Sequence, residues 1–187
     1  MDHLALADYR ARVAAMYLSD VDLAGFRARR DALFATHPQS AAPGPLRYFP
    51  PTGEFIATVP LTPAEGTLEI ATGGPDGVLR YERAGILDTP WGPLTLFWLA
   101  AYGGGLFLPF RDGTSGTETY GAGRYLTDTV KGTHGRGVDP LPDGRVRLDF
   151  NYAYNPSCAY RPLYQCPLAP WENRLETEIR AGELSYH

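Results

Sequence analysis

The feature that most constrains this fold is the way tight turns divide the chain after residue 43. Glycine, proline and aspartate cluster at 73–77, 103–105, 112–116 and 142–144. The segments between these clusters are short and contain the residue types that favour strands. Strands joined by such short turns must be antiparallel neighbours. We therefore predict strands near residues 46–49, 54–59, 67–72, 77–84, 93–100, 105–110, 118–127 and 145–153.

The first 40 residues have a different, helical periodicity. Leu6, Val13, Met16 and Tyr17 recur at helical spacing and predict an amphipathic helix over 3–18. A second helix is predicted over 22–36, and it ends before Pro38. Its apolar face is predicted to bury Leu23, Phe26, Leu33 and Phe34. Its charged residues are predicted to form a solvated face made of Arg27, Arg29, Arg30 and Asp31.

These patterns predict a mainly β (α+β) protein. The 187 residues, 44% of them hydrophobic, suffice for one packed core. We expect one domain over 1–187, with a helical part at 1–40, an antiparallel β core at 43–153 and a proline-rich closing segment at 154–187. The core is expected to be an antiparallel barrel or a strongly curled sheet, with the two N-terminal helices and the long irregular C-terminal segment covering it.

Charge and hydropathy exclude several classes of partner. The formal net charge is −4 and no basic run stands out, so nucleic acid is not an expected partner. No run of 18 apolar residues exists, so we expect no membrane span. Residues 1–16 lack the uninterrupted apolar core of a signal peptide, and a cytoplasmic location is therefore predicted. No organic cofactor is predicted, and the oligomeric state is left open.

The end of the last predicted strand holds two candidate site residues. In a strand over 145–153, Asp149 and Asn151 point away from the apolar row of Val146, Leu148 and Phe150. They lie where the chain enters the irregular segment 154–174. Polar groups at a strand end under such a segment are well placed to contact a ligand. The alternative is a structural hydrogen-bond pair that ties the loop to the barrel.

Two more charged residues extend this candidate site. Glu172 and Asp149 would form paired carboxylates for acid–base chemistry if both reached one cavity. The alternative for Glu172 is a local ion pair with Arg174. Arg124 could clamp an anionic substrate group, or it could pair with Asp149.

Cys158 and Cys166 are eight residues apart, so a disulfide is geometrically possible. A reducing cytoplasm argues against it. No metal site is predicted, because neither a second cysteine pair nor a histidine at ligand spacing accompanies them. Cys158 as a nucleophile would need a base such as His134 nearby in space. The favoured interpretation is that both are buried free thiols.

Four segments resemble the bacterial and archaeal family called domain of unknown function 1684. They are RDALFATHPQSA at 30–41, FRDGTSGTETYGAGRYL at 110–126, LDFNYAYNPSCAY at 148–160, and CPLAPWENRL followed by IRAGE at 166–183. The resemblance implies a soluble protein of about this length with one domain, and it implies no activity. The positions that it marks are Arg124, Asp149, Asn151, Asn155, Cys158, Cys166, Glu172 and Asn173.

The leading functional hypothesis is a small-molecule-binding barrel whose pocket is closed by residues 154–174. Its candidate ligand-binding residues are Arg124, Tyr125, Asn151, Tyr154, Asn155, Cys158 and Asn173. The alternative is a cofactor-independent hydrolase, lyase or isomerase that uses Asp149 or Glu172 as the general base. A third hypothesis is a structural or interaction protein, in which these residues only hold the closing segment in place.

Overall fold

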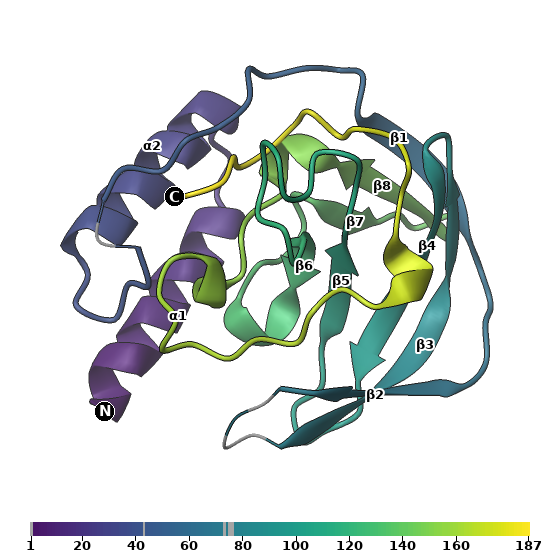
Figure 1. Ribbon diagram of the computed structural model, residues 1–187, viewed down its shortest axis with the longest axis horizontal. Helices are drawn as coiled ribbons and strands as arrows, with labels where there is room; N and C mark the ends of the chain where they lie inside the picture. The colour runs from purple at the N-terminus through teal and green to yellow at the C-terminus, as the bar shows by residue number, and fades with distance from the viewer. Residues whose placement is uncertain (1, 43, 73, 75–76) are drawn as a thin grey trace.

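The computed structural model describes residues 2–42, 44–72, 74 and 77–187. Two α-helices come first, and a sheet of eight strands follows (Figure 1). The helices and strands are α1 (His3–Tyr17), α2 (Leu23–Thr36), β1 (Ile56–Thr62), β2 (Thr67–Ala71), β3 (Val78–Thr89), β4 (Gly92–Leu99), β5 (Leu106–Phe110), β6 (Arg124–Asp128), β7 (Val138–Pro140) and β8 (Arg145–Asp149). Four single 3₁₀ turns are η1 (Thr129–Lys131), η2 (Phe150–Tyr152), η3 (Ser157–Ala159) and η4 (Trp171–Asn173).

The sheet is antiparallel throughout and nearly closes into a barrel. Its strand order is β6-β5-β4-β3-β1-β8-β7, with β2 paired to β3. The two end strands approach each other where Gly137 meets the carbonyl of Leu126. A Cβ at Gly137 would lie 2.3 Å from that oxygen, so only glycine fits this contact. The predicted fold class is therefore confirmed.

The core fills the inside of the curled sheet. Leu87, Leu94, Leu108 and Leu148 are fully buried there, and the rings of Phe110 and Phe150 meet edge to face. Inward side chains alternate with outward ones along β8, as the pleat requires.

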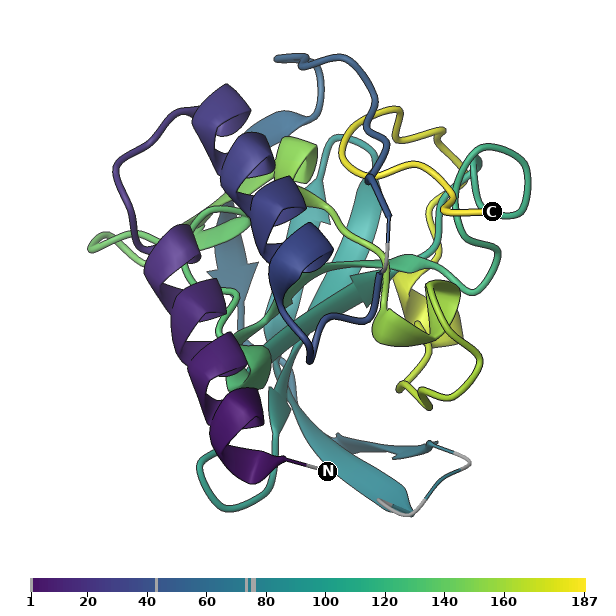
Figure 2. The same cartoon turned by 90° about the vertical axis from the view of Figure 1, so that its left-hand side faces the viewer.

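The two helices lie side by side against the outside of the barrel (Figure 2). The Asp2 and Asp22 side chains cap them by accepting hydrogen bonds from backbone N–H groups of the first turns. Both helices are confirmed to within one residue at each end. Arg30, however, is buried rather than exposed. Across the described ranges, no helix combines the length and the apolar character that crossing a membrane requires.

Several predicted strand boundaries are wrong. Residues 46–49 contribute only a single bridge, between Tyr48 and Glu183, and β6 starts at Arg124 rather than at residue 118. Local hydrogen bonds among Asp112, Thr114 and Thr119 hold the preceding residues in turns. The short strand β7 was not predicted. The predicted turn at 73–77 lies partly outside the described residues.

Candidate functional site

Asp149 and Asn151 tie a loop to the barrel. The strand predicted over 145–153 ends at Asp149. One oxygen of the Asp149 carboxylate accepts hydrogen bonds from the backbone N–H and the side-chain N–H of Asn151. These bonds fix the turn η2, which ends the strand. Arg147 pairs with the other oxygen at 3.0 Å. The Asn151 amide then exchanges two hydrogen bonds with the backbone of Thr52. The two side chains thus bond to each other, to Arg147 and to Thr52, and these bonds hold the loop at Thr52 against the end of β8.

Glu172 and Asn173 hold the turn η4 against the sheet. Glu172 makes a two-pronged ion pair with Arg83, at 2.8 and 3.1 Å, and accepts a hydrogen bond from the Thr95 hydroxyl at 2.9 Å. The predicted local pair with Arg174 is therefore wrong. The Arg83 guanidinium lowers the pKa of Glu172 below its ordinary value. A carboxylate held in this way is a poor general base at neutral pH.

Arg124 is fully buried and binds backbone. Its guanidinium donates to the carbonyls of Ile179, Ala181 and Glu183 and pairs with Asp112 at 3.3 Å. The predicted pairing with Asp149 is wrong. Arg124 therefore anchors the C-terminal residues of the chain to β6.

Asp149, Glu172 and Arg124 thus have separate sets of partners. Neither carboxylate shares a partner with the other, and none of the three lines either of the two cavities described next. The roles assigned to them in binding or catalysis stay predictions. Tyr125, Tyr154 and Asn155 do come together, in a cavity between the helices and residues 154–160.

This inter-layer cavity encloses about 70 Å³. Aromatic rings form much of its wall, and they belong to Tyr9, Phe34, Tyr125, Tyr154 and Tyr160. Its polar lining comes from Arg30, Lys131, Thr133, Asn155 and Ser157. Burial raises the pKa of the Tyr9, Tyr154 and Tyr160 hydroxyls, so these groups are protonated at neutral pH.

Arg30, Glu183 and Tyr160 form a buried network behind the cavity. Arg30 Nη2 donates to Glu183 Oε2 at 3.1 Å, and the Tyr160 hydroxyl lies 2.8 Å from both carboxylate oxygens. The backbone N–H of Asn155 donates to the same Oε2 at 2.7 Å. Burial lowers the pKa of Arg30, but Glu183 together with Tyr160, Tyr48 and Tyr17 more than offsets this and keeps the pKa above its ordinary value. Arg30 is therefore positively charged and lies against the Glu183 carboxyl group.

Two residues that line the cavity each have one buried atom without a hydrogen-bond partner among the described residues. These atoms are Arg30 Nε, a donor, and Asn155 Oδ1, an acceptor. The two residues are 4% and 2% exposed. Leaving such a group unpaired costs about 1–3 kcal/mol. A molecule in the cavity could satisfy both atoms.

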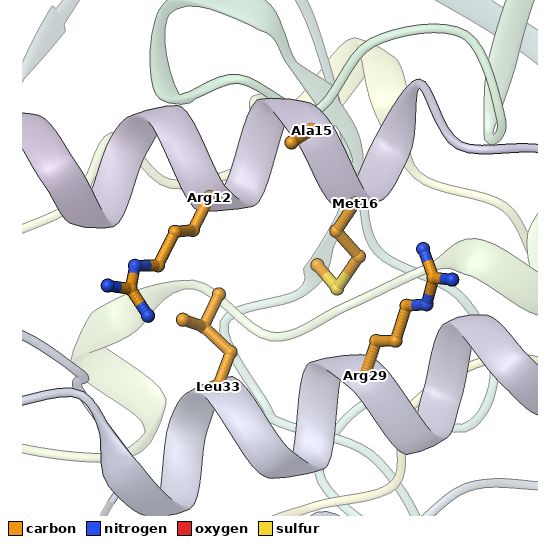
Figure 3. A pocket seen from close by; sticks show the side chains of 5 residues that line it. All are labelled: Arg12, Ala15, Met16, Arg29 and Leu33. Carbon is orange, nitrogen blue, oxygen red and sulfur yellow. The ribbon is translucent and has the colours of Figure 1, made fainter.

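The second hollow is an open groove between α1 and α2, of about 260 Å³. Figure 3 shows Met16 and Leu33 on its floor and the guanidinium groups of Arg12 and Arg29 toward opposite ends. Arg12 is paired with Asp8 at 2.8 Å and is largely exposed. The lining of this groove includes no unpartnered buried polar atom among the described residues.

Cys158 and Cys166 are free thiols beside the inter-layer cavity. Cys166 is buried in one cluster with Tyr125 and Tyr154, and the half-buried Cys158 packs against it. The Tyr120 hydroxyl donates to Cys158 Sγ at 3.8 Å. Cys158 thus has Tyr120 and Cys166 as neighbours. The described residues contain no group of three or more His, Cys, Asp or Glu side chains that could hold a metal ion.

Arg30, Tyr160 and Glu183 were not predicted as site residues. A usable signal was present for Arg30, because Phe26, Arg30 and Phe34 are four residues apart and share one helix face. A charged residue between two buried aromatic residues on that face is a candidate for a buried ion pair. The segments around Tyr160 and Glu183 lack periodicity, and their only signal was that both residues lie in segments that carry the family resemblance.

Residues 44–184 match the model of a family described as "Protein of unknown function (DUF1684)". A solution NMR structure of an uncharacterized protein from Haloarcula marismortui is similar to this chain, with 33% sequence identity and a TM-score of 0.58. The match covers 88% of this chain and 94% of that one. No curated protein matches the chain.

Proposed function

The chain belongs to the DUF1684 family of proteins of unknown function, and we propose that it binds a small uncharged molecule in the inter-layer cavity. The observation that carries this proposal is that two residues lining one cavity, Arg30 and Asn155, each have an unpartnered buried polar atom, Arg30 Nε and Asn155 Oδ1. One needs an acceptor and the other needs a donor. Both residues also bind the same oxygen of Glu183, so they are neighbours.

The chemistry of the wall narrows the class of ligand. Arg30 is already paired with Glu183, and Lys131 is paired with Asp128. Both pairs disfavour a ligand carboxylate, which would lack its own counter-ion. A primary amide carries a carbonyl acceptor next to an N–H donor and has no charge. The aromatic side chains suit an apolar body attached to that amide.

The volume limits the size of the ligand. Pockets for drug-sized ligands enclose about 300–1,000 Å³. The inter-layer cavity, at about 70 Å³, is much smaller. We therefore propose a ligand of a few non-hydrogen atoms. Because the partly buried Cys158 is a free thiol, we further propose that the protein works in a reducing cytoplasm.

Isobutyramide is a suitable probe, with isobutyrate and 3-methyl-2-butanone as controls of similar shape. The amide has both a donor and an acceptor, whereas the carboxylate adds a charge and the ketone lacks the donor. Proton–nitrogen correlation spectra report the Arg30 Nε–H directly. We expect the amide to shift this resonance, and the two controls to shift it several-fold less at equal concentration.

The matched variants are Asn155→Ala and Asn151→Ala. Both remove a buried amide, but only Asn155 lines the cavity. The first is expected to abolish the amide-specific shift, and the second to lower stability while leaving the shift intact. Equal responses to all three compounds, or no response to any of them, would contradict the proposal. No observation in the structure favours the alternative in which Asp149 or Glu172 acts as a general base.

A further inference from the structure

The strand β2 has one edge without a strand partner among the described residues. β1 and β2 follow one another along the same edge of β3, because β4 occupies the other edge. β8 covers the outer edge of β1 but begins at Arg145, opposite Pro60, and so does not reach β2. In both Figure 1 and Figure 2, β2 and the adjoining part of β3 project beyond the lower end of the barrel. The outer edge of β2 is therefore open.

The register shows which backbone groups of β2 point to this open edge. Arg83 N–H donates to the carbonyl of Gly66, and Thr72 N–H donates to that of Gly77. The even-numbered residues of β2 therefore exchange hydrogen bonds with β3, and the odd-numbered residues direct their N–H and C=O groups outward. These outward residues are Thr67, Glu69 and Ala71. Among the described residues, only the Thr67 carbonyl receives a hydrogen bond there, from Arg83 at 3.3 Å.

The side chains of β2 alternate between two faces. Leu68 and Ile70 pack against the aromatic cluster that contains Tyr81, and both are only partly buried. Glu69 lies on the other face, which is exposed, opposite Arg80 of β3. A strand added to the open edge would set alternate side chains beside Leu68 and Ile70 and the side chain between them beside the Glu69 carboxylate.

We propose that β2 accepts an extended segment of a partner protein as an additional antiparallel strand, and that this segment carries a lysine or arginine between two β-branched apolar residues. Backbone hydrogen bonds to Glu69 and Ala71 hold the segment in place. Its cation lies opposite Glu69, because opposite charges on facing strands attract. Its apolar residues extend the face formed by Leu68 and Ile70. This interaction is independent of ligand binding in the inter-layer cavity.

The same glutamate disfavours a second copy of this chain as the partner. In a symmetric pairing of two β2 edges that uses all the outward residues, the two-fold axis passes through the middle one, so the two Glu69 side chains face each other. Like charges directly opposite destabilise a strand pair, and the net charge of −4 adds to the repulsion. Charged side chains on an edge strand protect it against self-association. Here the protecting charge also selects a basic partner.

The probe is the peptide acetyl-Thr-Val-Lys-Val-Thr-amide, and the readout is amide hydrogen exchange measured by NMR. In the free protein, the N–H groups of Leu68 and Ile70 should be protected by β3, whereas those of Glu69 and Ala71 should exchange fast. We expect the peptide at millimolar concentration to slow exchange at Glu69 and Ala71 several-fold. The same peptide methylated on the lysine backbone nitrogen cannot form the central hydrogen bond and should give no protection.

Two variants separate the charge from the backbone. Glu69→Lys should bind the lysine peptide several-fold more weakly than the natural protein does, and should prefer the peptide with glutamate in place of lysine. Ala71→Pro removes an outward N–H without removing a bond to β3 and should also weaken binding several-fold. Val78→Thr is the control, because this exposed position on β3 lies opposite Ala71 and leaves the open edge unchanged. If the proline variant does not fold, the methylated peptide tests the same edge on the natural protein.

Several results would overturn the proposal. One is the absence of protection at Glu69 and Ala71 with the lysine peptide, and another is equal protection by the lysine and glutamate peptides. Protection at these two residues that rises with protein concentration without any peptide would assign the edge to a second copy of the chain instead.

Discussion

Asn173 shows how much one buried amide contributes to this fold. Its Oδ1 accepts a hydrogen bond from the Thr95 N–H at 2.7 Å, and its Nδ2 donates to the carbonyls of Thr95 and Pro109 at 2.9 and 2.8 Å. The amide therefore joins β4 to β5 beyond their last register pair, which is Phe97 with Phe107. It replaces backbone pairing that the two strands lack at this position.

We expect Asn173→Ala to lower the free energy of unfolding by about 3 kcal/mol, because it leaves the Thr95 N–H and two carbonyls unpaired in the interior. Urea denaturation followed by fluorescence measures this. Thr36→Ala is a matched control, since it also removes a hydrogen bond to a carbonyl but at an exposed position. A loss below about 1 kcal/mol at Asn173 would contradict the bridging role.

At the scale of single residues, the sequence pointed to positions that are buried and hydrogen-bonded, but it did not reveal the partners of those residues. Asp149 was identified from its place at a strand end, Asn173 from the segment rich in proline and aromatic residues, and Arg124 from the separate glycine-rich stretch before β6. Their partners are Thr95, the C-terminal carbonyls and the turn η2. These contacts join residues far apart in the chain, and one sequence carries no information about such distances.

The turn η4 shows that the contacts between whole elements were also not predictable from the sequence. Three residues, Trp171–Asn173, fix the closing segment to β3 and β4, chiefly through the Glu172 pair with Arg83. Strand formation itself was predictable, because turn residues mark the ends of β2, β3, β4 and β5. The region before β6 was not, because its threonines favour strands by propensity but bond to one another in turns.

The Glu172–Arg83 pair predicts a pH dependence of stability. The folded state lowers the pKa of Glu172 from its ordinary value of 4.5. The unfolded chain therefore binds this proton first as pH falls, so the stabilisation is complete above the unfolded pKa and is lost as pH drops through the folded pKa. Glu172→Gln should be less stable than the natural protein near neutral pH, and the difference should shrink on acidification.

Urea denaturation of both proteins from about pH 7 to about pH 3 measures this difference. Glu176→Gln is the matched control, since that glutamate is exposed and should give a small, pH-independent change. A difference that grows on acidification would contradict the sign of the pKa shift.

For the whole molecule, the decisive contacts join the helices to the barrel. Arg136 donates to the carbonyls of Tyr17, Ser19 and Val21 at the connection between α1 and α2, and to the Tyr152 hydroxyl at 3.1 Å. Its guanidinium also lies over the rings of Phe26 and Tyr152. The inter-layer cavity lies in the same junction between layers, so its shape depends on how firmly the helices are held.

Arg136→Ala tests whether helices and barrel unfold as one unit, as the predicted single domain requires. Removing several charge-assisted hydrogen bonds should lower the free energy of unfolding by at least about 2 kcal/mol. Arg145→Ala is the control, because it breaks only a surface pair with Asp143 and should change stability much less. Far-ultraviolet circular dichroism follows the helices. Tryptophan fluorescence follows the barrel, because all three tryptophans lie outside the helices and Trp91 packs on Phe55 and Phe150. In one cooperative domain both signals shift together. A helical signal lost at lower urea than the fluorescence signal would show that the helices unfold separately, and the single-domain prediction would then be wrong.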